Sequence, residues 1–74
     1  MTEVEQEVIG YRKQSVEEID LVNEGKRLAQ KCGEFIERLE AMESLDQRCV
    51  SLGKTNLQQG FMWATRGITR PTTF

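Results

Sequence analysis

The side chains best suited to chemistry are cations beside aromatic rings, and they gather near the two ends of the 74-residue chain. Near the N-terminus, Gly10 is followed by Tyr11, Arg12 and Lys13. An aromatic ring can stack on a nucleobase, and a guanidinium can bind a phosphate through two parallel hydrogen bonds. The same groups recur near the C-terminus, in Arg66, Arg70, Thr72, Thr73 and Phe74. Each cation taken singly is typical of a solvated surface, but the two groups together favour a nucleotide-like ligand.

The composition argues against an enzyme or a metal protein. The chain has no histidine, which is the usual general base near neutral pH and the commonest metal ligand. Its two cysteines, Cys32 and Cys49, lack the spacing and the number of a zinc site. We expect both to be small core residues in a reducing cytoplasm. No catalytic residues, metal or cofactor are predicted.

The charge is distributed unevenly along the chain. Residues 1–45 carry five more acids than bases and residues 46–74 carry three more bases than acids, for a net charge of −2. An acidic chain without a long basic run is a poor binder of polymeric DNA or RNA, which needs many phosphate contacts. A small anion needs only a few cations. No apolar run approaches the ~20 residues that span a bilayer, so we expect no membrane contact.

Two helices must position these groups. Ser15 and Glu18 fit a capping box at the start of a first helix over residues 15–43. Residues 43–46 are the expected turn, with Ser44 or Asp46 capping a second helix over residues 45–69. Pro71 then prevents further helix. The prediction is an all-α, antiparallel two-helix hairpin forming one domain over residues 1–74, with an N-terminal arm (1–14) and a C-terminal tail (70–74).

Both helices carry more apolar surface than one hairpin can bury. On the first helix one stripe repeats with coiled-coil spacing and a second stripe lies beside it. On the second, Gly53, Gly60 and Gly67 recur every seven residues, which predicts close approach of a backbone or a flat ligand. A chain this short rarely builds a sufficient core by itself. We therefore expect a compact helical homo-oligomer with closed symmetry and sites between its copies.

Specific motifs carry a resemblance to a known family. They are Ile9-Gly10-Tyr11-Arg12, Ile19-Asp20-Leu21-Val22-Asn23, Lys26, Asp46-Gln47-Arg48, Thr55-Asn56-Leu57-Gln58-Gln59-Gly60-Phe61-Met62, Arg66 and Arg70-Pro71-Thr72-Thr73-Phe74. Together they span roughly residues 9–74. On them the chain resembles the bacteriophage anti-CBASS sponge proteins, whose helical-hairpin domain is shared with anti-Thoeris sponges.

The resemblance implies a hexameric, non-enzymatic sponge in the cytoplasm of an infected bacterium. Such a sponge sequesters cyclic dinucleotides, such as cyclic GMP-AMP, and in some members cyclic trinucleotides, and so keeps CBASS immune effectors silent. Carried over to this sequence, Tyr11 would stack on a base and Lys26, from the same or another copy, would meet a phosphate, with Arg12 in support. Arg66, Arg70, Thr72 and Phe74 are the candidates for a second pocket.

Two other functions are open on the residues. The regular apolar spacing of the first helix is equally typical of a structural or adaptor protein that binds a partner protein and no nucleotide. A small DNA-binding regulator is disfavoured by the acidic first helix.

Overall fold

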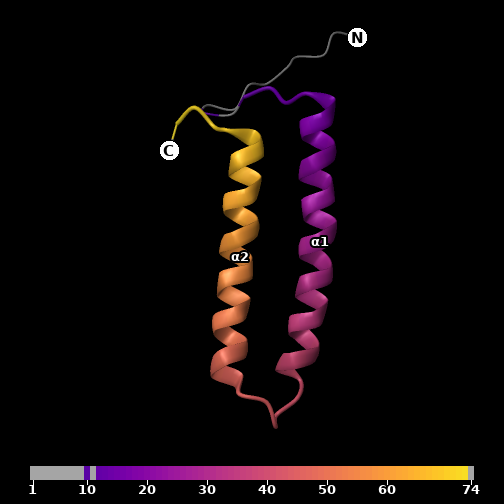
Figure 1. The fold of residues 1–74 in the computed structure, drawn as a ribbon, viewed down its shortest axis with the longest axis vertical. Helices are drawn as coiled ribbons and strands as arrows, with labels where there is room; N and C mark the ends of the chain where they lie inside the picture. Colours follow the sequence, from indigo (N-terminus) through magenta and orange to yellow (C-terminus); the bar gives the residue numbers. More distant parts are fainter. Residues whose placement is uncertain (1–9, 11, 74) are drawn as a thin grey trace, which may run out of the picture.

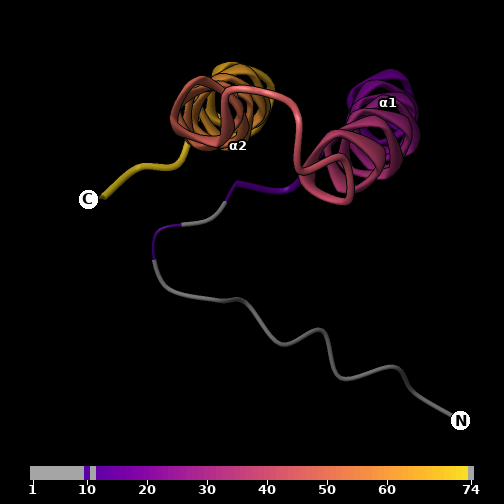
Figure 2. The same cartoon turned by 90° about the horizontal axis from the view of Figure 1, so that it is seen from below.

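The computed structural model describes residue 10 and residues 12–73, and these form two helices. Helix α1 spans Val16–Glu40 and helix α2 spans Gln47–Thr69. They run antiparallel and lie side by side in both views (Figures 1 and 2). No strand occurs among the described residues. The predicted all-α, two-helix hairpin is confirmed.

The N-terminus of α1 is fixed by the predicted capping box. The Glu18 backbone N–H donates to Ser15 Oγ at 3.1 Å, and the Ser15 backbone N–H donates to Glu18 Oε1 at 2.8 Å. Two N–H groups that the helix leaves without partners are thereby satisfied.

The turn between the helices is longer than expected. Helix α1 ends at Glu40 rather than at residue 43, and α2 begins at Gln47 rather than at residue 45. The Gln47 side-chain amide donates to the carbonyls of Leu39 and Met42, at 3.1 and 2.9 Å, and so ties the start of α2 to the end of α1 and the turn. Asp46, rather than Ser44, caps α2 by accepting from the backbone N–H groups of Arg48 and Cys49.

The seam between the helices takes alternate members of the regular apolar stripe of α1, together with members of the second stripe beside it. The partly or fully buried positions of α1 repeat every three or four residues: Glu18, Val22, Gly25, Ala29, Cys32, Ile36 and Leu39. Ile36 is the most enclosed described residue, at 6% exposure. Leu21, Leu28, Phe35 and Met42 recur every seven residues and remain about half exposed. We call these four residues the outer stripe.

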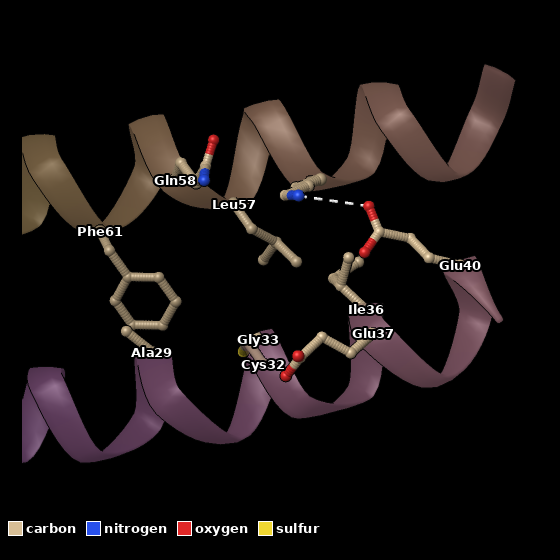
Figure 3. Close-up of a pocket in the computed structure, with 10 residues that line it drawn as sticks. Ala29, Cys32, Gly33, Ile36, Glu37, Glu40, Leu57, Gln58 and Phe61 are labelled. Carbon is tan, nitrogen blue, oxygen red and sulfur yellow. Dashed lines mark hydrogen bonds and ion pairs between the residues drawn. The ribbon is translucent and has the colours of Figure 1, made fainter. Parts of the chain in front are cut away.

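Helix α2 also leaves apolar groups unburied. Leu57 and Phe61 point towards α1 in Figure 3, whereas Met62 and Trp63 are 58% and 63% exposed. Beyond the helix's own backbone and the chain neighbours, no described atom lies within 4 Å of a Cβ built on Gly53, Gly60 or Gly67, so the described residues do not make the close approach predicted there.

The two cysteines differ in their surroundings. Cys32 is half-buried in the seam, while Cys49 is exposed and its thiol donates to Asp46 Oδ2 at 3.2 Å. The expectation that Cys49 is a core residue is wrong for the single chain, because the first turn of α2 presents it to solvent. No helix in the described part of the chain is long and apolar enough to cross a membrane.

Candidate functional site

The N-terminal arm and the C-terminal tail meet at the open end of the hairpin (Figure 1). The Thr72 backbone N–H donates to the Gly10 carbonyl at 2.7 Å. The Gln14 side-chain amide donates both to the Arg12 carbonyl, at 2.9 Å, and to the Thr69 carbonyl, at 3.1 Å. We call these segments, residues 10 and 12–14 with residues 69–73, the clasp. It joins parts of the chain that are more than fifty residues apart in sequence.

Glycine is required at the arm's end of the clasp. Gly10 has a φ of +86°, a region that residues with a side chain rarely adopt. A Cβ built on Gly10 would lie 2.0 Å from Thr73 Oγ1, so a side chain here would force Thr73 or the arm to shift. The arm backbone and the Thr73 side chain are therefore in direct contact.

One carboxylate holds an arginine from each side of the clasp. Arg70 Nη2 donates to Glu18 Oε2, and Arg12 Nη1 lies 3.9 Å from the same oxygen. The Glu18 and Arg12 side chains are 20% and 35% exposed, and the Arg70 side chain is 57% exposed. Two of the predicted phosphate-binding groups, assigned to different pockets, thus share one counter-ion.

The Glu18 carboxyl is set to remain ionised. Its hydrogen bond from the Ser15 backbone, with those from the Ser15 side chain and Arg70, holds the Glu18 pKa below its ordinary value. Its negative charge offsets part of the positive charge of the two arginines. An incoming phosphate must therefore share these arginines with Glu18 or displace it.

Arg12 also carries an unsatisfied donor. Its Nη1 is buried and has no hydrogen-bond partner among the described residues. Buried donors of this kind are uncommon because losing water without gaining an acceptor is costly. The group is suited to donate a hydrogen bond to an oxygen of a ligand or of another copy of the chain.

The rest of the second predicted pocket lies on the last turn of α2 and on the tail. Arg70 ends α2 in the left-handed conformation, with a φ of 46°, and its backbone N–H donates to the Arg66 carbonyl. Arg66 Nη2 donates to the Thr73 carbonyl at 3.2 Å. Thr72 is exposed. Arg66, Arg70 and Thr72 are thus gathered at one end, while Tyr11 and Phe74 lie outside the described residues.

Lys26 stands apart from this group. It is exposed on α1, ten residues beyond Val16, which places it roughly 15 Å along the helix from its start. There it borders a shallow groove of about 320 Å³ together with Gly25, Ala29, Gln58, Phe61, Met62 and Thr65. The structure therefore brings Arg12 and Arg70 together on Glu18 and does not bring Lys26 to them within one chain.

A larger groove lies between the helices towards the turn (Figure 3). Its volume is about 550 Å³, and its floor consists of Ala29, Cys32, Ile36, Leu57 and Phe61. Lys54 at its edge is paired with Glu40, with Nζ and Oε2 3.2 Å apart, and Glu37 lies nearby. An apolar groove edged by acids is unsuited to a phosphate. Within the described part of the chain, no three His, Cys, Asp or Glu side chains group as a metal site would need.

Sequence reasoning missed Gln14 and Glu18 as parts of this site, and it placed Thr73 in the C-terminal group without its contact with Gly10. The sequence indicates Glu18 as half of a capping box, but nothing in the pattern indicates that its second carboxylate oxygen faces two arginines. It indicates Gly10 only as a break before the helix, because the Thr73 side chain that contacts Gly10 is distant in sequence.

The comparisons with known proteins agree with the motifs. The profile described as "Acb2/Tad1, hairpin domain" matches residues 3–69. A search of curated protein sequences found no significant match. The profile covers both helices and the arm up to the start of α1, and the tail from residue 70 onwards lies beyond it. Because the match covers well over half of the chain, the protein belongs to the Acb2/Tad1 hairpin-domain family of anti-CBASS and anti-Thoeris sponges, which bind ligands without catalysis.

Proposed function

We propose that this protein binds and sequesters cyclic di- and trinucleotide second messengers, and so blocks CBASS signalling in the cytoplasm of an infected bacterium. The family match over residues 3–69 carries this proposal. Sequestration requires affinity and abundance rather than catalysis. It is therefore compatible with a chain that has no histidine.

The clasp supports an anionic ligand. Arg12 and Arg70 lie close enough to share one carboxylate, and Arg12 has a buried donor without an acceptor. A charge-assisted hydrogen bond to phosphate contributes about 1.5–3 kcal/mol. In the proposal Tyr11 adds base stacking, worth roughly 1–3 kcal/mol per base, and Arg12 supports the phosphate.

The proposal also includes more than one copy of the chain. Lys26 lies eight residues, roughly 12 Å, along α1 from Glu18, which Arg12 contacts, so it meets the ligand from the same or from a neighbouring copy. A hexamer in which Lys26 comes from a neighbouring copy would complete the dinucleotide site. The outer stripe, Met62 and Trp63 provide apolar surface for such contacts. Arg66, Arg70, Thr72 and Phe74 are the proposed residues of a separate trinucleotide pocket.

Isothermal titration calorimetry against a panel of cyclic di- and trinucleotides tests the proposal. We expect tight binding of at least one member, and recovery of that ligand chemically intact after the protein is denatured by heat. Tyr11→Ala combined with Lys26→Ala should weaken dinucleotide binding at least tenfold, while Lys31→Ala, a matched exposed lysine on α1, should not. Unchanged affinity in the double variant would overturn the site assignment, and a linear product would indicate an enzyme.

A second candidate function follows from the outer stripe. Apolar side chains exposed every seven residues are the pattern of a helix that binds another helix. An adaptor would capture a partner protein through this stripe and bind no nucleotide. Pull-down with a Leu28→Lys variant as control distinguishes this function from self-assembly, because an adaptor would lose its partner yet keep its own mass in solution.

A further inference from the structure

The clasp joins residues that the sequence assigns to two different sites. Thr72, a candidate of the second pocket, donates its backbone N–H to the carbonyl of Gly10, two residues before Arg12 of the first. Gln14 bonds the carbonyls of both Arg12 and Thr69. The backbone on either side of Arg12 is thus tied to the tail, through Gly10 and Thr72, and to the last residue of α2, through Gln14 and Thr69.

Thr73 contributes a contact of a different kind. Its Oγ1 occupies the space that a Cβ at position 10 would need, and its Cβ would lie 3.2 Å from such an atom. Its carbonyl accepts from Arg66 Nη2 at 3.2 Å. Thr73 is therefore packed on the arm on one side and held by α2 on the other.

We propose that the C-terminal tail is the positioning element of the arm, and that the Gly10–Thr73 contact sets the ligand affinity of Arg12. The inference rests on the proposed function, because it concerns affinity for the same cyclic dinucleotide. A cation on an arm that is already held in place binds a phosphate without the entropic cost of ordering that arm. Thr73 therefore acts on the ligand through Arg12.

A double-mutant cycle tests this inference. Gly10→Ala introduces the clash with Thr73 Oγ1, and Thr73→Ala removes that atom, so the pair should compensate in part. The matched control is Gly10→Ala with Thr55→Ala, since Thr55 is an exposed threonine in the middle of α2. Far-UV circular dichroism verifies that each variant keeps its helices, because Gly10 lies outside both.

Two quantities are measured for each variant. The first is the hydrogen-exchange rate of the Thr72 amide without ligand, which reports whether the clasp is closed. The second is the affinity for cyclic GMP-AMP by calorimetry. We expect Gly10→Ala to speed Thr72 exchange and weaken binding at least about tenfold, and Thr73→Ala to restore roughly threefold or more of that loss. The Thr55→Ala control should restore none.

The outcomes separate this inference from the function on which it rests. If Gly10→Ala speeds Thr72 exchange and yet binds as tightly as the natural chain, the tail does not position Arg12 and this inference is wrong, while the proposed function stands. Equal rescue by Thr73→Ala and Thr55→Ala would also overturn it. If the natural chain binds no member of the nucleotide panel, the proposed function fails, and this inference with it.

Discussion

Replacement of Leu28 by alanine measures whether the outer stripe is buried between copies of the chain. In the hairpin Leu28 is 49% exposed, whereas Ile36 in the seam is 6% exposed. Full burial of a leucine side chain contributes about 1.5–3 kcal/mol, so the half that the hairpin already covers is worth roughly 1 kcal/mol. If the stripe faces only solvent, Leu28→Ala therefore costs about 1 kcal/mol or less of unfolding free energy.

Burial of the stripe in an oligomer changes that figure. A fully buried leucine replaced by alanine typically costs about 2–5 kcal/mol, because lost transfer free energy and a cavity add together. We expect a loss in this range for Leu28→Ala, similar to that for Ile36→Ala. Since a chain of this size rarely gains more than about 3–5 kcal/mol from its own core, the variant should also be largely dissociated at low concentration.

Urea denaturation at two protein concentrations, with sedimentation of the same samples, is the assay. Gln30→Ala, an exposed polar position on α1, is the matched control and should leave both stability and mass unchanged. The reasoning is refuted if Leu28→Ala costs less than about 1 kcal/mol and the denaturation midpoint of the natural chain does not depend on concentration.

Three further predictions concern single groups. Ser15→Ala removes an N-cap and should cost about 0.5–2 kcal/mol, read as a lower denaturation midpoint, whereas Ser44→Ala, which caps nothing, should cost little. Because the pKa of Glu18 is lowered, its contribution to stability is complete above the ordinary pKa of 4.5 and is lost as the pH falls through the lowered value. Glu18→Gln should therefore reduce the fall of the melting temperature at acid pH. An unchanged fall would contradict the assignment. The hydrogen bond to Asp46 and its charge raise the pKa of the Cys49 thiol, so Asp46→Asn should speed alkylation of Cys49 at pH 8, and an equal or slower rate would count against that contact.

Local signals in the sequence were sufficient for the two helices. The Ser15–Glu18 capping box acts over three residues, and the α1 start followed from it. The turn is longer than predicted. The Gln47 side chain bonds the carbonyls of residues 39 and 42 across it, and the local sequence pattern does not indicate this contact. The seam was also displaced: both apolar rows of α1 have helical spacing, and only the partner helix decides that Ile36 rather than Phe35 is enclosed.

The candidate site was predictable by residue type and not by arrangement. Arginines, threonines and aromatic groups at both chain ends indicated an anionic ligand, and the structure brings Arg12, Arg70 and Thr72 to one end of the hairpin. The contact of Arg70 with Glu18 joins residues 52 apart in sequence, and Thr72 bonds the still more distant Gly10, so periodicity does not encode this arrangement. Lys26 lies further along α1, eight residues beyond Glu18, and nothing in the sequence pattern indicates whether it joins the same site.

The central claim is that the protein holds cyclic nucleotides without changing them. Calorimetry of the intact protein against the cyclic di- and trinucleotide panel, followed by chromatography of the ligand released on heating, measures this directly. The account predicts tight binding of at least one cyclic nucleotide and its quantitative recovery in cyclic form. Absence of binding across the panel, or recovery of a linear nucleotide, would contradict it.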